Sequence, residues 1–270
     1  MPDEDEQFRA YHRVVSAFAG KPVVIRTFDV GGDKLPIGVY TTEANPFLGW
    51  RAIRVCLDEP ELFKTQLRAL LRAAAFGDVR IMLPLIVTLD EVRAARRLLL
   101  EASDELTARG VELRSDVPLV VMVETPAAAI GADILAPEVA FFSIGTNDLV
   151  QYTLAVDRGN VNLAERFTPL HPSVLRLIRR TVQAGTAAGL DVAVCGEMAS
   201  QPLMAFALIG LGVRQLSVGA QSVALVKRVI RGISVDVARA ALESAILAGT
   251  AEEVEKVLRA AVQSAFGDAP

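Results

Sequence analysis

The stretch FFSIGTNDLVQYTLAVDRGN, residues 141–160, begins like a buried strand and then changes character within a few residues. It is mostly apolar as far as Ile144, and an amide and a carboxylate follow at Asn147 and Asp148. Arg158 comes ten residues after that carboxylate. A hydrophobic run that ends in an amide beside a carboxylate, with an arginine one short element later, predicts a strand whose end carries functional side chains.

Outward from this strand, apolar runs alternate with helix-like segments along the chain. Seven predicted strands contain, in order, Ile25, Trp50, Met82, Met122, Phe142, Val194 and Leu216. These runs are continuously apolar, as expected for parallel strands that are covered on both faces. The pattern predicts an α/β fold of the TIM (β/α)8 barrel type, lacking its first strand in this chain, with a doubly wound open sheet as the alternative. No Pro/Gly-rich linker interrupts the pattern, so residues 1–270 are expected to form one domain.

The helical segments show apolar residues at helical spacing and recognisable ends. They are predicted at residues 4–19, 59–77, 88–110, 127–135, 171–189, 202–212 and 222–232, and two more helices complete the chain. Thr88 is expected to cap the third of these helices and Gly110 to end it.

The composition narrows the classes of function. A chain of 270 residues that is 52% hydrophobic can bury a large core. The net charge of −4 argues against a general nucleic-acid binder, which would show a basic stripe. Two cysteines outside any CxxC motif indicate a reducing compartment, so a cytoplasmic location is expected. The N-terminus does not resemble a signal peptide, and no stretch approaches ~18 uninterrupted apolar residues, so no membrane span is expected.

Polar side chains collect at the predicted strand ends, which is where a barrel places its chemistry. These ends present Arg26, Asp29, the GGDK segment at 31–34, Arg51, Arg54, Glu124, Asn147, Asp148, Arg158 and Cys195. Glu124 and Asp148 follow neighbouring strands, and carboxylate oxygens suit Mg²⁺. The arginines supply planar fork donors for phosphate or carboxylate, and Asn147 can donate without adding charge. The set predicts a pocket for a small phosphorylated acid that is held with a divalent ion.

Each of these residues also has a purely structural interpretation. Glu124 could cap the helix that follows it, and Asp148 could be a turn residue. Asp29 could be the ion-pair partner that Arg26 needs if that arginine is buried in its strand. Cys195 could be a small hydrophobic residue of a buried strand. The functional interpretation therefore depends on all these groups falling at the same end of successive strands.

Six segments carry a resemblance to a known family. They are RTFDVGGDKLP at 26–36, EANPFLGWRAIR at 43–54, VMVETPAAA at 121–129, the stretch at 141–160, HPSVLRLI at 171–178 and CGEMA at 195–199. In this order they resemble the C-terminal phosphoenolpyruvate-binding domain of enzyme I, the phosphoenolpyruvate–protein phosphotransferase of the bacterial sugar phosphotransferase system. The resemblance runs from about residue 3 to near the C-terminus. Pyruvate phosphate dikinase and phosphoenolpyruvate synthase share shorter versions of the motifs and are the alternative.

The resemblance implies a role for each polar residue. It implies that phosphoenolpyruvate is bound by Arg26, Arg51, Asn147, Asp148 and Arg158. It implies that Glu124 and Asp148 bind Mg²⁺. It further implies that Cys195 protonates the enolate that remains after the phosphoryl group departs, which gives pyruvate.

The resemblance also implies partners. Enzyme I passes the phosphoryl group to a histidine in a separate domain and, through it, to a phosphocarrier protein. Neither of the two histidines here lies in a Thr-Ser-His setting, and the family's first barrel strand, with its Arg-Thr-Glu, is not found. The chain is therefore expected to be a fragment or truncated product, incomplete for turnover, with exposed strand edges that favour a homodimer. A non-catalytic dimerisation or regulatory module and a Mg²⁺-dependent carbon–carbon lyase are further alternatives.

Overall fold

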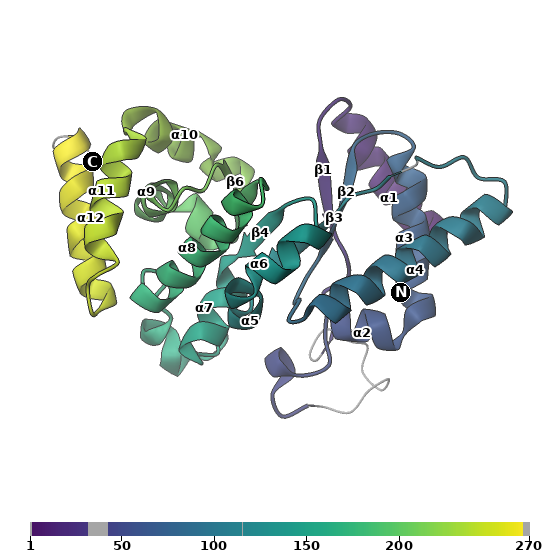
Figure 1. The fold of residues 1–270 in the computed structure, drawn as a ribbon, viewed down its shortest axis with the longest axis horizontal. Coiled ribbons are helices and arrows are strands. Elements are labelled where there is room, and N and C mark those ends of the chain that lie inside the picture. The colour runs from purple at the N-terminus through teal and green to yellow at the C-terminus, as the bar shows by residue number, and fades with distance from the viewer. Residues whose placement is uncertain (1, 32–42, 115, 267–270) are drawn as a thin grey trace. The chain divides into compact units, whose positions relative to one another are not determined.

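The structure is a computed structural model that describes residues 2–31, 43–114 and 116–266 (Figure 1). Its residues separate into two compact units, which are described one at a time. The first unit comprises Met1–Met122 and Glu138–Ala140, and the second comprises Val123–Pro137 and Phe141–Pro270. Most of the predicted GGDK segment lies outside the described residues. None of the described helices is long and apolar enough to cross a membrane.

The first unit contains parallel strands that alternate with helices. Its elements are α1 (Glu4–Ala17), β1 (Val23–Arg26), η2 (Pro46–Leu48), α2 (Ile53–Asp58), α3 (Pro60–Ala74), β2 (Val79–Leu83), α4 (Leu89–Ala108) and β3 (Leu119–Val123), whose last residue begins the second unit. The strands pair in the order β1-β2-β3, with Val23 opposite Val79 and Ile81 opposite Leu119. All of β3 is buried, which is why its sequence is continuously apolar.

The predicted helix signals of this unit are confirmed. Thr88 and Glu91 form a capping box at the start of α4, in which each side chain accepts from the other residue's backbone N–H. Gly110 follows α4 with φ +74°, a left-handed conformation that glycine adopts without steric cost.

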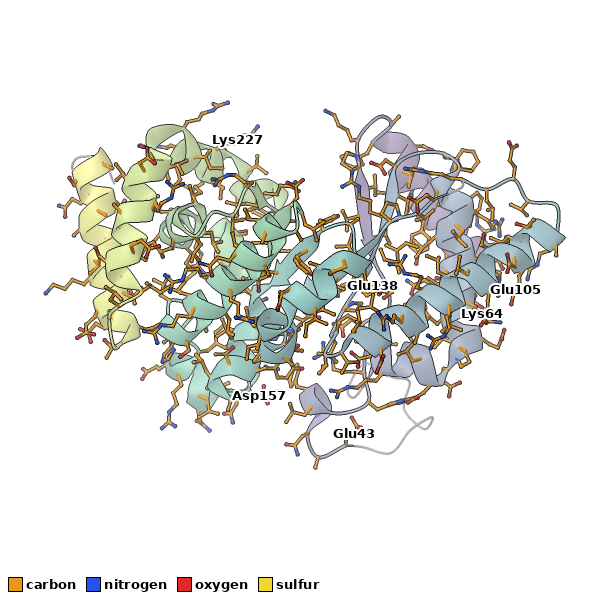
Figure 2. All side chains as sticks on the ribbon, in the orientation of Figure 1. Glu43, Lys64, Glu105, Glu138, Asp157 and Lys227 are labelled. Atoms are coloured by element: carbon orange, nitrogen blue, oxygen red, sulfur yellow. The ribbon has the colours of Figure 1, made fainter. Side chains whose placement is uncertain are left out.

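Ion pairs hold the three long helices of the first unit together. Lys64 on α3 lies 2.7 Å from Glu105 on α4, and both side chains are labelled in Figure 2. Arg68 on α3 pairs with the same Glu105 at 2.6 Å and with Glu4 on α1 at 2.7 Å. Because these contacts link surfaces that already pack against each other, we interpret them as scaffold rather than as a site.

The second unit repeats the alternation with more helices. Its elements are α5 (Pro126–Ile130), α6 (Ala132–Leu135), β4 (Phe142–Gly145), α7 (Thr146–Leu154), η4 (Val161–Arg166), α8 (Pro172–Ala187), β5 (Val192–Cys195), η5 (Glu197–Ser200), α9 (Pro202–Gly210), β6 (Gln215–Leu216), η6 (Ala220–Ser222), α10 (Val223–Gly232), α11 (Val235–Ala245) and α12 (Ala251–Phe266). A short turn, η3 (Ala136–Glu138), leads back to the first unit. The strands pair in the order β4-β5-β6, all parallel, with Gly145 opposite Cys195.

Strand order within each unit follows chain order, and each strand is separated from the next by helix. A doubly wound sheet would reverse its strand order at a switch point, whereas a barrel does not. The predicted α/β fold of partial TIM-barrel type is therefore confirmed.

The prediction of a strand at Trp50 is wrong. Here the described residues form η2, an isolated antiparallel bridge between Gly31 and Arg51, and then α2. Between them Ala52 adopts a left-handed conformation with φ +53°, which a continuous strand does not allow. Six strands, not seven, are found in the described ranges, and the predicted strand around Leu216 is only two residues long.

Candidate functional site at the strand ends

The junction between β4 and α7 differs from the sequence prediction. The strand ends at Gly145, and α7 begins at Thr146, so Asn147 and Asp148 lie in the first turn of a helix rather than at the end of a strand. The alternative that Asp148 is a turn residue is therefore wrong, and its side chain is buried in α7, with the residue 5% exposed. The first turn of a helix presents backbone N–H groups with the positive end of the helix dipole, which favours a bound anion.

The turn after β5 is clamped to this first helical turn. The hydroxyl of Thr146 donates to the carbonyl of Cys195 at 3.3 Å, and the backbone N–H of Glu197 donates to Oδ1 of Asn147 at 3.2 Å. Gly196 between them has φ +102°, and a Cβ there would lie 2.5 Å from Oγ1 of Thr146. Since Oδ1 of Asn147 is engaged by this clamp, its amide nitrogen is the group that can donate to a ligand.

Two hydrogen bonds orient the thiol of Cys195. The Ser143 hydroxyl on β4 donates to Sγ at 3.3 Å, and Sγ itself donates to the carbonyl of Ile144 at 3.5 Å. The thiol is half-buried rather than sealed in the core. Ser143 was not predicted as a site residue, although a hydroxyl inside the otherwise apolar run FFSIG is a signal that could have identified it.

The two cysteines are expected to differ sharply in reactivity. Cys56 is fully buried, and burial, together with the nearby charge of Asp29, raises the pKa of its thiol to about 12. Because only the thiolate reacts, Cys56 should be alkylated at least ~100-fold more slowly than Cys195 at pH 8. Mass spectrometry after iodoacetamide treatment should find one label on the native chain and two in denaturant. Labelling of Cys56 at a similar rate in the native chain would contradict this prediction.

Glu124 follows β3 directly and is 3% exposed. The alternative that it caps the next helix is wrong, because the Thr125 side chain caps α5 by accepting from the N–H of Ala128 at 3.1 Å. Glu124 and Asp148 are thus two buried carboxylates in the same unit, after β3 and β4. Buried carboxylates are costly unless they are paired, hydrogen-bonded or bound to metal.

The donor set of these carboxylates fits Mg²⁺. This ion usually takes one or two protein carboxylates and completes its octahedron with water and substrate phosphate oxygens. Within the ranges that the structure describes, no three His, Cys, Asp or Glu side chains gather as a closed metal site. An ion at Glu124 and Asp148 would therefore depend on ligand oxygens for the rest of its coordination.

The arginines of the first unit lie around Asp29. Arg51 donates to its carboxylate from Nη2 at 2.7 Å and from Nε at 3.2 Å, and the two side chains are only 6% and 7% exposed. Arg26 lies 3.6 Å from the other oxygen of Asp29, with its side chain 44% exposed. Asp29 is thus an ion-pair partner of Arg26, as the structural alternative had it, but Arg26 is exposed and the closer partner of Asp29 is Arg51.

The remaining arginines differ in role. Arg54 donates to the carbonyls of Leu48 and Gly49 at 2.7 and 2.8 Å, so it holds the loop before α2. Arg158 lies beyond α7 on an exposed loop, where its backbone N–H donates to the side chain of Gln151 at 3.0 Å. The structure thus groups the predicted residues by unit: Arg26 and Arg51 in the first, and Glu124, Asn147, Asp148, Arg158 and Cys195 in the second.

Fold and site together define an α/β barrel-type protein with acidic, amide and thiol groups where parallel strands end. The family model described as "PEP-utilising enzyme, PEP-binding domain" matches residues 1–235, and the chain belongs to this family. The predicted family resemblance is therefore confirmed.

Curated relatives agree with this assignment. The chain is 47% identical over 255 residues to the phosphoenolpyruvate-protein phosphotransferases of Geobacillus stearothermophilus and Staphylococcus carnosus (strain TM300), covering 94% of this chain and 44% of each relative. It is 44% identical over 259 residues to that of Haemophilus influenzae, covering 96% of this chain and 45% of the relative. The chain thus spans less than half the length of these relatives.

A solved structure shows the same fold. A citrate lyase from Burkholderia xenovorans LB400 superposes with a TM-score of 0.52 at 18% identity, covering 95% of this chain and 79% of the lyase. At this identity the similarity concerns the fold alone, and it agrees with the partial barrel described above.

Proposed function

We propose that this chain is the phosphoenolpyruvate-binding domain of a phosphoenolpyruvate–protein phosphotransferase. The observation that carries the proposal is the clamp in the second unit: Thr146 and Asn147 fix the backbone on both sides of Gly196. The first turn of α7, with its anion-binding N–H groups and Asp148, is thereby tied to the turn that carries the Cys195 thiol. An anion-binding helix end beside a thiol that can donate a proton suits phosphoenolpyruvate, whose phosphate must be bound and whose enolate must be protonated after the phosphoryl group departs.

Substrate binding requires several cationic or N–H donors, because phosphoenolpyruvate carries a phosphate and a carboxylate. The proposal assigns these anionic groups to Arg26, Arg51 and Arg158, to the amide of Asn147 and to the backbone at Asp148. Guanidinium groups suit this task because their forked donors match phosphate and carboxylate oxygens in pairs. Arg51 is already held in one orientation by Asp29, which lowers the entropy lost on binding.

Glu124 and Asp148 would hold Mg²⁺, which supplies charge neutralisation to the phosphoryl group when bound. The chain's own chemistry follows phosphoryl departure. The enolate of pyruvate takes the proton of Cys195 at its methylene carbon, so that the S–H bond breaks, a C–H bond forms and pyruvate results. The thiolate keeps the sulfur's electron pair, and the Ser143 hydroxyl, which already donates to Sγ, stabilises that charge.

The phosphoryl acceptor is proposed to be a histidine on a separate domain, which passes the group on to a phosphocarrier protein. The two histidines of this chain have structural roles instead. His12 packs edge-on against Phe76 with ring centroids 4.3 Å apart, and Nδ1 of His171 accepts from the N–H of Ser173 at the start of α8. A homodimer is part of the same proposal.

Calorimetry with phosphoenolpyruvate, with and without Mg²⁺, tests the proposed function. Glu124→Gln keeps the size of the side chain but removes a charged ligand, so Mg²⁺-dependent affinity should fall by about 100-fold. Glu243→Gln is the matched control, because Glu243 is an exposed carboxylate on α11 of the same unit. It should bind like the wild type.

Two results would contradict the proposal. One is the absence of Mg²⁺-dependent heat in the wild type, and the other is unchanged binding by Glu124→Gln. If the first were accompanied by a tight dimer in sedimentation that ignores the ligand, the chain would instead be a dimerisation or regulatory module.

A further inference from the structure

Gln151, in the second turn of α7, accepts hydrogen bonds from the end of the helix and from the loop after it. Its backbone carbonyl accepts from the N–H of Ala155, the left-handed cap of α7, and from the N–H of Val156 at 3.1 Å. Its side-chain Oε1 accepts from the N–H of Arg158 at 3.0 Å. Gln151 therefore accepts three hydrogen bonds from the segment 155–158, which contains Asp157, labelled in Figure 2.

The amide of Gln151 is an unusual group for its position. The residue is 4% exposed, and its Nε2 is buried without a hydrogen-bond partner in the part of the chain that the structure describes. Burying an amide in this way costs more than burying an apolar side chain of similar length. The side chain of Gln151 accepts a hydrogen bond from the N–H of Arg158, and we interpret this bond as the reason for a buried amide here.

Gln151 also relates Arg158 to the candidate site. It lies three residues after Asp148, so the two residues share one face of α7, a turn apart. Both are buried, whereas Arg158 and its neighbours Asp157 and Gly159 are exposed. A loop that is exposed to solvent keeps a fixed position only where bonds to the rigid part of the fold hold it.

We propose that Gln151 is a positioning residue, which holds the backbone of Arg158 against α7 so that the guanidinium reaches the anion bound at the first turn of the same helix. The inference rests on the proposed function, because that function makes Arg158 a ligand of phosphoenolpyruvate. The effect of Gln151 on binding is then exerted through Arg158 alone. A residue that contributed only to the stability of the fold would instead affect binding with or without the Arg158 side chain.

The test removes the acceptor oxygen of Gln151 and compares the variant with a control on the same helix. Gln151→Met has a similar length but no acceptor, so Arg158 loses its backbone bond. Thr153→Val is the control on the same helix, since its hydroxyl donates to the Leu149 carbonyl and does not touch the loop.

Two measurements are made on the whole chain. Hydrogen exchange of the Arg158 amide, followed by NMR, should accelerate about tenfold in Gln151→Met and stay near wild type in Thr153→Val, because one hydrogen bond of this kind corresponds to up to about tenfold in an equilibrium. Calorimetry with phosphoenolpyruvate and Mg²⁺ should show about tenfold weaker binding by Gln151→Met and wild-type binding by Thr153→Val.

The binding measurement is repeated in an Arg158→Ala background. If Gln151 acts through Arg158, Gln151→Met should cause no further loss there, whereas an independent structural contribution would cause the same loss in both backgrounds. Equal losses, or an Arg158 amide whose exchange does not change, would overturn the inference while leaving the proposed function intact. A wild-type chain that binds no phosphoenolpyruvate would overturn both.

Discussion

Cys195→Ala is expected to slow the exchange of pyruvate methyl protons with solvent deuterons by about 10²–10⁴-fold, the range that one positioned acid or base contributes. In this exchange the proposed protonation runs backwards and then forwards. The thiolate of Cys195 removes a methyl proton from pyruvate, and the thiol, after exchange with D₂O, returns a deuteron to the enolate. It requires no phosphoryl acceptor, so this chain can be assayed with pyruvate and Mg²⁺ alone. NMR of the methyl signal in D₂O gives the rate directly.

Cys195→Ala should remove the thiol without moving the turn that carries it. The clamp to α7 uses the backbone carbonyl of Cys195 and not its sulfur, so the turn should keep its position when the thiol is removed. Cys56→Ala is the control, because Cys56 is fully buried and its raised thiol pKa keeps it protonated. Exchange at the wild-type rate in Cys195→Ala would show that another group moves the proton.

Local patterns predicted much of the fold. Continuous apolar runs predicted β1 to β5, and short-range signals such as the capping box of Thr88 and Glu91 predicted helix ends, because strand burial and helix capping depend on residues close in sequence. The predicted strand at Trp50 failed for the opposite reason. Its apolar residues are placed by a bridge from Gly31 to Arg51 and by a left-handed Ala52, and local hydrophobicity encodes neither.

The candidate site shows the same division. The residue types at the strand ends could be predicted, because parallel strands place their carboxyl ends together. Their partners could not, since they depend on contacts between distant residues. Arg51 meets Asp29 across 22 positions, and Ser143 meets Cys195 across 52. Gln151 was missed because, in sequence, a glutamine in an amphipathic helix resembles a solvent-facing residue, whereas here it is buried to hold a loop.

Asp29→Ala is expected to lower the free energy of unfolding by about 3–5 kcal/mol, because it leaves the guanidinium of Arg51 buried without its carboxylate. Both side chains of this pair are almost fully buried. The matched control is Asp78→Ala, which breaks the ion pairs of Asp78 with Arg80 and Arg114. The side chains of these pairs are about one-third or more exposed, so the loss of the pairs should lower the free energy of unfolding by only about 0–1 kcal/mol. Urea unfolding can be followed by the fluorescence of Trp50, the single tryptophan, which neighbours Arg51.

A double variant identifies the cause of the Asp29 effect. If the loss arises from an uncompensated buried charge, Asp29→Ala combined with Arg51→Met should be more stable than Asp29→Ala alone, because the second change removes that charge and leaves an apolar side chain of similar length. If instead Asp29 stabilises the unit through other contacts, the two losses should add. Additive losses would refute the buried-pair explanation, and with it the argument that Asp29 holds Arg51 ready for an anionic ligand.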